Sequence, residues 1–350
     1  MSVVTIVGAG MMGTALCYPL ADNQHTIRLV GTPLDEEIIT SIRSKQVHPI
    51  LQRRVPDGIK AYSFTELPQA LAGTHFVING VSSFGIPWFA STVGPLLKPE
   101  VPVLSVTKGL EDQPNGDLLI FPTAINNRLP PQLKDKISLN AIGGPCTAHE
   151  LAARRQTCVV YTGKDLRVLE QFKALLGTPY YHIWLSLDML GVEFSAALKN
   201  AYALAVGIAV GMMEKAGPDG LALAYNPQAA LFAQGTYEIR RWLELAGAGV
   251  ENASWLPGAG DLYVTIYGGR TVRLGKLLGQ GVAFVEAMRI LSGVTLESVE
   301  IITRIGRALS KLEARRIIQP DDFPLIRHLN RVINYGEKVN IPWDSFFHRI

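Results

Sequence analysis

Residues 3–13 read Val3-Val4-Thr5-Ile6-Val7-Gly8-Ala9-Gly10-Met11-Met12-Gly13, a β-branched run followed by the pattern Gly-x-Gly-x-x-Gly. Between a strand and a helix, the first glycine permits a tight turn and the second lets the backbone approach a pyrophosphate. The third lets the helix pack closely on the strand. A second β-branched run, Thr26–Val30, follows in the order such a unit requires. These residues predict a dinucleotide-binding turn in which Gly8, Gly10, Met11, Met12 and Gly13 contact the cofactor. The alternative is a glycine turn that binds no nucleotide.

The first half of the chain alternates β-branched runs with helical patterns. Near-continuous apolar strands separated by helices are typical of a parallel sheet covered on both faces. The predicted strands are Val3–Val7, Thr26–Val30, His75–Asn79, Val101–Val106, Ile137–Ile142 and Thr157–Tyr161, and the predicted helices are Met12–Asp22, Leu34–Ser44, Phe64–Ala72 and Ile86–Leu97.

After about residue 185 the strand pattern stops and long helical periodicities replace it. The predicted helices are Leu187–Glu214, Pro227–Ala246, Leu274–Leu278, Ala283–Leu291, Leu296–Leu312 and Phe323–Asn334. We therefore predict an α/β Rossmann-like domain with a doubly wound sheet over residues 1–187. An all-α domain that binds the substrate follows over residues 188–350.

Composition excludes several classes of protein. The 350 residues include 33 Lys and Arg against 30 Asp and Glu, a net charge of +3, and 48% are apolar, so neither disorder nor nucleic-acid binding is favoured. Three cysteines without a CxxC pair, and histidines without ligand spacing, predict no disulfide framework and no metal site. The first residues resemble no signal peptide. The apolar stretch 201–213 is shorter than the roughly 20 residues of a membrane span, so we predict a cytoplasmic protein with a buried core helix.

The end of the second predicted strand bears on the choice of cofactor. NAD-specific sites usually place an acidic residue there to bind the ribose 2′-hydroxyl, and this chain has Gly31-Thr32 instead. A missing acid removes the repulsion against a 2′-phosphate, which favours NADP(H), with Thr32 among the cofactor contacts. Asp35 and Glu36 lie slightly further along and could serve less directly.

Four later segments carry candidate catalytic residues. Lys108 directly follows an apolar strand, at the edge of the sheet where ligands bind, and Gly143-Gly144-Pro145-Cys146 follows another strand. Asp261 and Arg270 lie in two glycine-rich loops. Lys199 lies in an apolar helix, where burial would lower its pKa and make the amine a usable general acid or base. The alternative is a lysine that extends its amine to solvent.

At these segments the chain resembles the NAD(P)-dependent glycerol-3-phosphate dehydrogenases. The resemblance covers nearly the whole chain and rests on GAGMMGTAL, SVTKGLE, GGPCTAHE, GVEFSAALKNAYALAVGI and LPGAGDLYVTIYGGR. The strand end at Gly31-Thr32 resembles the archaeal branch of this family more than the bacterial one.

The resemblance implies a role for each matching residue. Lys199 would be the general acid that protonates the carbonyl oxygen while hydride reaches C2 of dihydroxyacetone phosphate, and Asp261 would hold Lys199. Lys108 would orient the substrate, polarise its carbonyl and lie near the cofactor. The further implied substrate contacts are Gly144, Cys146, Asn200, Thr265, Arg270 and Thr271, and the further implied cofactor contacts are Ala148, Arg270 and Glu297. The alternative for Glu297 is an exposed helix start.

Three departures from the family leave the substrate open. The family usually has Ser or Thr at Cys146, Asn at Thr271, and Asn-Ala-Lys where this chain has Asn226-Pro227-Gln228. The resulting prediction is a homodimeric enzyme that uses NADP or NAD and a phosphorylated small molecule. The alternatives are a dehydrogenase of the same fold acting on another phosphorylated or acidic keto compound, and a non-catalytic NADP-binding regulator.

Overall fold

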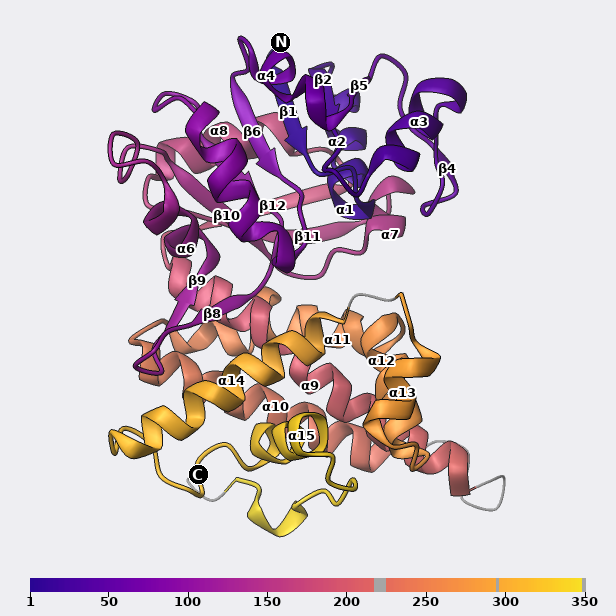
Figure 1. Ribbon diagram of the computed structural model, residues 1–350, viewed down its shortest axis with the longest axis vertical. Coiled ribbons are helices and arrows are strands. Elements are labelled where there is room, and N and C mark those ends of the chain that lie inside the picture. The colour runs from indigo at the N-terminus through magenta and orange to yellow at the C-terminus, as the bar shows by residue number, and fades with distance from the viewer. Residues whose placement is uncertain (217–224, 294–295, 348–350) are drawn as a thin grey trace. The chain divides into compact units, whose positions relative to one another are not determined.

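The computed structural model describes residues 1–216, 225–293 and 296–347, and the chain divides into two compact units (Figure 1). Unit 1 comprises Met1–Lys108 and Phe121–Val192, and unit 2 comprises Gly109–Ile120 and Glu193–Ile350. We expected a contiguous division between residues 187 and 188. In the structure a short insertion in unit 1, Gly109–Ile120, belongs to unit 2.

Unit 1 is built on an eight-stranded sheet with the order β12-β11-β10-β7-β6-β1-β2-β5. Its strands are β1 (Val3–Val7), β2 (Thr26–Val30), β5 (Lys60–Tyr62), β6 (Phe76–Asn79), β7 (Val103–Ser105), β10 (Leu139–Gly143), β11 (Thr157–Thr162) and β12 (Tyr181–Ser186). The chain runs from β1 outward to β2 and returns to the other side of β1 as β6. The strand order therefore reverses at β1, where doubly wound folds bind their ligands.

The sheet is not wholly parallel, which corrects the prediction from the alternating pattern. β10 and β11 are antiparallel, whereas the strands from β10 to β5 all run in one direction. The connection between β10 and β11 contains only the five-residue helix α7 (Ala148–Ala152). Such a helix spans about 7.5 Å, whereas a parallel crossover must carry the chain back along a strand of about 17 Å.

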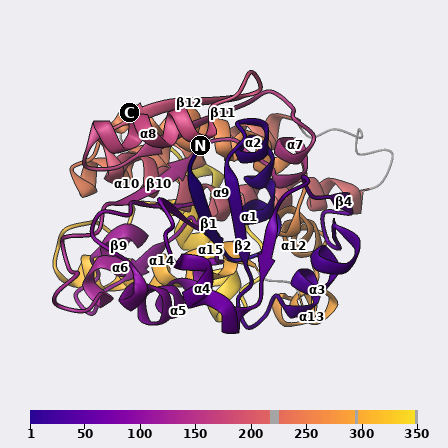
Figure 2. The ribbon, with the colours of Figure 1, turned by 90° about the horizontal axis from the view of Figure 1, so that it is seen from above.

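Each face of the sheet has its own core, because alternate residues of the inner strands point to opposite sides. Figure 2 shows the ribbon from above, with helices on both faces of the sheet. In β1, Ile6 faces α1 (Met11–Ala15), α2 (Cys17–Asp22), α7 and α8 (Leu166–Leu176). The next residue, Val7, faces the opposite helices. These are α4 (Leu67–Leu71), α5 (Ile86–Trp88) and α6 (Phe121–Arg128), while α3 (Glu36–Lys45) packs on the side of α2.

The predicted helix Met12–Asp22 is divided in the structure at Leu16, between α1 and α2. Pro19 lies in the first turn of α2 and has no N–H to donate to the carbonyl of Ala15. The chain can therefore turn after the short helix that carries Gly13.

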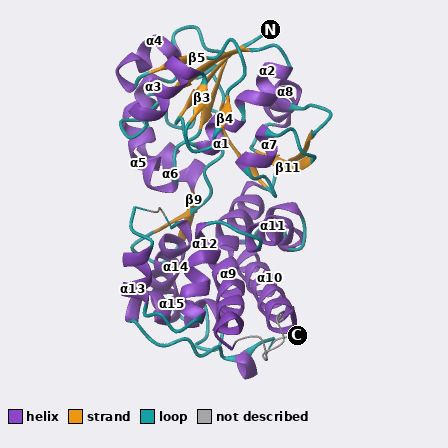
Figure 3. Ribbon diagram, turned by 90° about the vertical axis from the view of Figure 1, so that its right-hand side faces the viewer, coloured by secondary structure: helices purple, strands orange, loops and turns teal. Residues whose placement is uncertain are grey.

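Unit 2 is almost entirely helical (Figure 3). Its helices are α9 (Met189–Ala216), α10 (Tyr225–Ala246), α11 (Asp261–Ile266), α12 (Arg270–Gly279), α13 (Phe284–Ile290), α14 (Glu297–Ala314) and α15 (Pro324–Tyr335). By length and composition α9 could cross a membrane, but 83% of its most apolar window is buried inside the protein. The prediction of a buried core helix is therefore confirmed.

The insertion after Lys108 is a hairpin of β8 (Leu110–Asp112) and β9 (Leu118–Ile120) that packs on α14. Arg307 forms a two-bond ion pair with Asp112, at 2.7 and 2.8 Å, and Arg304 donates to the carbonyl of Leu110. Lys311 donates to the carbonyl of Gln113. These cations are spaced along one face of α14, which explains why the hairpin belongs to unit 2.

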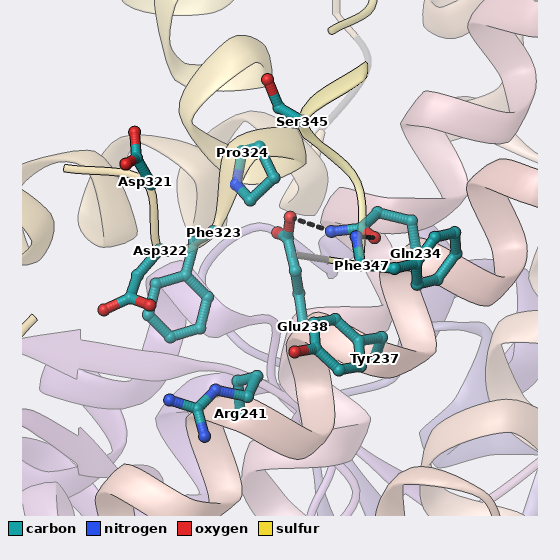
Figure 4. A pocket seen from close by; sticks show the side chains of 10 residues that line it. All are labelled: Gln234, Tyr237, Glu238, Arg241, Asp321, Asp322, Phe323, Pro324, Ser345 and Phe347. Carbon is teal, nitrogen blue, oxygen red and sulfur yellow. Dashed lines mark hydrogen bonds between the residues drawn. The ribbon is translucent and has the colours of Figure 1, made fainter. Parts of the chain in front are cut away.

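A buried carboxylate, that of Glu238, joins three helices in the core of unit 2. Figure 4 shows Glu238 beside Gln234. Glu238 of α10 accepts from the Tyr202 hydroxyl of α9, at 3.0 Å, and from the backbone N–H groups of Leu325 and Ile326, at 2.7 and 3.0 Å. Gln234, one turn earlier on α10, donates a fourth hydrogen bond at 2.8 Å. The carboxylate thus caps the start of α15, and burial raises its pKa to about 7.

Candidate active site

The glycine turn after β1 has the tight backbone that its sequence predicts. Gly8 adopts a φ of +107°, and a β-carbon there would lie 2.7 Å from the backbone of Gly80, which follows β6. A β-carbon on Gly13 would lie 2.3 Å from the carbonyl oxygen of Gly8. Both positions therefore require glycine for packing within the protein itself.

Two polar side chains hold the peptide groups of Ala9 at the centre of this turn. The Asp35 carboxylate accepts from the Ala9 N–H at 3.2 Å, and His48 lies 2.9 Å from the Ala9 carbonyl through Nε2. Because Nδ1 of His48 accepts from the N–H groups of Ile50 and Leu51, Nε2 carries the proton and donates. Burial lowers the pKa of His48, which favours the neutral ring. Neither side chain belongs to the glycine motif, and His48 was not among the predicted site residues.

A pocket of about 420 Å³ lies beside the turn, at the carboxyl edge where the strand order reverses. Its lining comes from the segments after β1, β2 and β6. The lining residues are Gly8, Gly10, Thr32, Pro33, Leu34, Asp35, Gly80, Val81, Ser82, Phe84, Gly85 and Trp88. Glycine backbone on one side and apolar side chains on the other suit a nucleotide, with its phosphates beside the glycines. The structure thus brings Gly8, Gly10 and Thr32 together, and the bound cofactor would supply hydride.

Gly10 and Gly13 make a matched pair for a test. A β-carbon on Gly10 would meet nothing closer than the Gly80 carbonyl at 4.0 Å, so Gly10→Ala should leave the melting temperature within about 2 °C of wild type. It should weaken cofactor binding about tenfold or more, because the methyl group occupies the approach of the pyrophosphate. Gly13→Ala should lower the melting temperature by about 5 °C or more. Calorimetric melts and cofactor titrations measure both, and unchanged cofactor affinity in Gly10→Ala would place the pyrophosphate elsewhere.

A second group of predicted residues follows β7 and β10. Lys108 donates from Nζ to the carbonyl of Gly144 at 3.1 Å, and Gly144 has a φ of +110°. The strand register places Ser105 of β7 beside Ala141 of β10, which brings the two loops to one edge. The half-buried Cys146 and the buried Ala148, the first residue of α7, complete this group.

Hydrogen bonds between neighbouring strand ends keep this edge in place. Asn79 at the end of β6 donates to the Ser105 hydroxyl at 3.1 Å, and the Thr107 hydroxyl donates to the Val81 carbonyl at 2.7 Å. Lys108 therefore follows a segment that is hydrogen-bonded at two points to the end of β6, which restricts the positions that its amine can reach.

In unit 2, Lys199 and Asp261 form a buried ion pair between α9 and α11. Lys199 is 8% exposed and Asp261 is 1% exposed. Nζ of Lys199 also donates to the Thr265 hydroxyl at 3.0 Å, and that hydroxyl donates to the Asp261 carbonyl at 2.7 Å. Thr265 lies one helical turn after Asp261, so both contact the same amine. The burial predicted for Lys199 is therefore seen in the structure, with polar partners at its amine, and the alternative of an amine extended into solvent is excluded.

The glycine-rich loop before Asp261 explains how its carboxylate reaches α9. A β-carbon on Gly258 would lie 2.2 Å from the carbonyl of Ala253, so only glycine lets the turn at Leu256–Gly260 pack on the preceding backbone. Asp261 follows as the first residue of α11, where the helix dipole favours an acidic side chain.

Asn200 and Glu297 form a contact that the sequence did not predict. The Asn200 amide donates to Glu297 at 3.3 Å, and Glu297 is the first residue of α14. Both are at least half-buried, so Glu297 is not a simple exposed helix start. The preceding residues 294 and 295 lie outside the described part of the chain.

Four glycines set the position of α12 against α9. Gly207 and Gly211 lie one turn apart on α9, and Gly275 and Gly279 lie one turn apart on α12. A β-carbon on Gly211 would lie 2.1 Å from the Lys276 carbonyl, so the two backbones touch. This contact fixes the helix that begins with Arg270.

Arg270 and Thr271 differ in exposure at the start of α12. The Arg270 side chain is exposed and has no hydrogen bond or ion pair with the residues that the structure describes, whereas Thr271 is buried. A guanidinium in this state is available to an anionic ligand.

Apart from Arg270 and Thr271 at the start of α12, the predicted site residues form four local groups, and each is contained in one unit. Unit 1 holds the glycine turn and the Lys108–Gly144 contact. Unit 2 holds the Lys199–Asp261–Thr265 group and the Asn200–Glu297 contact. Over residues 1–216, 225–293 and 296–347, no three His, Cys, Asp or Glu side chains gather into a possible metal site.

The comparisons with known proteins agree along the whole chain. Residues 3–168 match the family model described as NAD-dependent glycerol-3-phosphate dehydrogenase N-terminus, and residues 188–343 match the C-terminus model of the same family. An NADP(+)-dependent glycerol-3-phosphate dehydrogenase of Archaeoglobus fulgidus is 33% identical over 96% of each chain. A glycerol-3-phosphate dehydrogenase [NAD(P)+] of Bacillus pumilus is 30% identical over 100% of this chain and 95% of its own.

Solved structures confirm the fold. The crystal structure of glycerol-3-phosphate dehydrogenase from Coxiella burnetii has a TM-score of 0.80 at 24% identity, with 96% of each chain covered. The structure of the Plasmodium falciparum enzyme of the same name has a TM-score of 0.82 at 18% identity, covering 100% of this chain and 96% of that one. The family resemblance seen in the sequence is confirmed, and the chain belongs to the NAD-dependent glycerol-3-phosphate dehydrogenase family.

Proposed function

We propose that this chain is an enzyme that reduces dihydroxyacetone phosphate to glycerol 3-phosphate, reversibly, with NADH or NADPH as hydride donor. The buried amine of Lys199, held by Asp261 and Thr265, is the observation that carries the proposal. Family membership and the names of the two relatives support the same reaction.

Lys199 serves as the general acid. Hydride adds to C2 of the substrate, and the Lys199 ammonium gives its proton to the carbonyl oxygen as charge develops there. In the reverse direction the neutral amine takes that proton back. Asp261 keeps the buried amine in place and balances its charge, and Thr265 fixes its direction.

Lys108 supplies a second cation toward the carbonyl. Its amine is restrained by the carbonyl of Gly144, and Cys146 and Ala148 follow on the same loop. A cation near the developing oxyanion lowers the energy of the transition state. Met11 and Met12 offer backbone N–H groups at the start of α1 to the cofactor phosphates.

Arg270 binds the substrate phosphate, because its exposed guanidinium is available and has the planar geometry that phosphate prefers. Asn200 and Thr271 contribute hydrogen bonds to the substrate. Glu297 contacts the cofactor, and its carboxylate accepts from the Asn200 amide.

The activity is tested directly with the purified chain. Addition of dihydroxyacetone phosphate should consume NADH or NADPH, and the product should be glycerol 3-phosphate by mass spectrometry. The control is the same protein without substrate. No consumption of either cofactor under these conditions would contradict the proposed reaction.

One alternative substrate class, other phosphorylated or acidic keto compounds, is suggested by Cys146, Thr271 and Gln228. All three depart from the usual family residues at positions that the resemblance places near the substrate. A panel of other phosphorylated and acidic keto compounds, run beside dihydroxyacetone phosphate, measures the preference. A higher kcat/KM for another member would assign the chain to that substrate instead.

The resemblance to the family supports a homodimer. Cys17, Cys146 and Cys158 form no disulfide among the described residues, which is compatible with a reducing cytoplasm. We propose both. Sedimentation of the purified chain as a monomer would contradict the assembly.

A further inference from the structure

We infer that Asp35 makes this chain select NAD(H) over NADP(H). The inference rests on the proposed use of a nicotinamide cofactor, and it reverses the preference that the sequence alone favours. It starts from a carboxylate that lies five residues beyond the end of β2, where the sequence position suggests no strong role.

The fold brings the Asp35 carboxylate back to the end of β2, where the chain itself has no acidic residue. Oδ2 of Asp35 accepts from the backbone N–H and the hydroxyl of Thr32, both at 2.8 Å, and from the Ala9 N–H at 3.2 Å. Gly31 permits the return, because a β-carbon there would lie 2.7 Å from Ile39 and 3.3 Å from Cβ of Asp35. Asp35 is therefore bound to both the glycine turn and the end of β2.

Three donors on one oxygen fix the carboxylate and leave the other oxygen for a ligand. No donor among the described residues reaches Oδ1, and Asp35 lines the pocket beside the turn. A carboxylate oxygen only accepts hydrogen bonds when ionised, and a ribose 2′-hydroxyl can donate one. A 2′-phosphate has no such proton to offer at neutral pH and carries negative charge.

The charge around the pocket opposes a 2′-phosphate as well. Its lining contains no lysine or arginine among the residues that the structure describes, and Asp35 is followed by Glu36 and Glu37 in the first turn of α3. A phosphate at this point would face the Asp35 carboxylate, and no cation in the described lining would offset that charge. NADP-binding folds usually place an arginine here instead.

The arginines on the adjoining elements are engaged elsewhere. Arg28 of β2 donates to the carbonyls of Ala70 and Ala72, at 2.8 and 2.6 Å, on the side of the sheet that packs α4. Arg43, in the last turn of α3, is paired with Glu66. Neither lines the pocket, so neither offsets the Asp35 charge there.

The test measures cofactor binding without substrate, which separates it from the reaction. NADH and NADPH are titrated separately into the purified full chain by calorimetry. Wild type should bind NADH about tenfold or more tightly than NADPH. Asp35→Asn keeps the size of the side chain and removes its charge, and it should shift the ratio of the two dissociation constants toward NADPH about tenfold.

Two further variants make the result specific to Asp35. Glu37→Gln removes the same charge from a neighbouring residue outside the pocket lining and should change the ratio by less than about twofold. Leu34→Arg adds a cation at a lining position that is 93% exposed, so the fold should tolerate it, and it should favour NADPH.

Wild type that binds NADPH as tightly as NADH would overturn the inference, as would equal shifts from Asp35→Asn and Glu37→Gln. If neither cofactor binds, the proposed function fails and the inference fails with it. NADH selection without turnover of dihydroxyacetone phosphate would support the inference and contradict only the proposed reaction.

Discussion

Lys199→Met should lower kcat for reduction of dihydroxyacetone phosphate about 1,000-fold while leaving the cofactor dissociation constant within about twofold. The methionine keeps the length of the side chain but cannot give a proton to the carbonyl oxygen. Steady-state kinetics and cofactor titration measure the two quantities. Turnover near the wild-type rate would mean that another group supplies the proton.

The same substitution also separates chemistry from stability. Methionine leaves the Asp261 carboxylate buried without its ammonium partner, and such a loss costs about 3–5 kcal/mol of unfolding free energy. Adding Asp261→Asn should recover part of that stability but none of the activity. Lys276→Met, on an exposed ion pair of α12 with Glu214, is the matched control and should change both quantities little. Recovery of activity in the double variant would contradict the assignment of Lys199.

Glu238→Ala should lower the free energy of unfolding by about 3 kcal/mol or more. The alanine removes the acceptor of four hydrogen bonds, from Tyr202, Gln234, Leu325 and Ile326. Each of these donors is then left without its acceptor, in the core or at the start of α15. Chemical denaturation measures the change, and Glu244→Gln, in an exposed ion pair of the same helix, should change it by less than about 1 kcal/mol.

The titration of Glu238 should make the free energy of unfolding depend on pH. Its pKa is about 7 in the folded protein and near its ordinary 4.5 when unfolded, so the folded state binds more protons between these values. Its stabilising contribution is therefore complete below pH 4.5 and is lost as the pH rises through 7. Raising the pH from 5 to 8 should remove about 2–3 kcal/mol in wild type, and Glu238→Gln should lack this component. Parallel pH curves for the two proteins would show that the carboxyl does not titrate in this range.

Local sequence was sufficient for the elements that have a strong period or a strong glycine signature. β1, β2 and the turn at Gly8 begin and end where the β-branched runs and glycines predict. The long helices of unit 2 were also predicted, because their apolar spacing extends over several turns. Short elements such as β5, β12 and α11 were missed, because three to six residues carry too little periodicity to distinguish a strand or a helix from a loop.

The residues of the candidate site also divide into those that a local motif predicts and those that only the structure reveals. Lys199, Lys108, Asp261 and Arg270 were predicted because their residue types occur in recognisable local motifs. His48 and the Asn200–Glu297 contact were not, because their partners are 39 and 97 residues away in sequence. No local pattern encodes such a pairing.

By itself, the sequence determined a tight glycine turn after the first strand, an α/β part followed by a helical part, and the family to which the chain belongs. Tertiary structure alone decided what surrounds those residues. Asp35 lies beyond the strand end in sequence, yet three donors bring its carboxylate to the turn. Gly207 and Gly211 could be interpreted only as part of an apolar helix until their backbone contact with α12 was known. The physical reason is that backbone preferences act over a few residues, whereas charge and close packing act between whichever groups the fold makes neighbours.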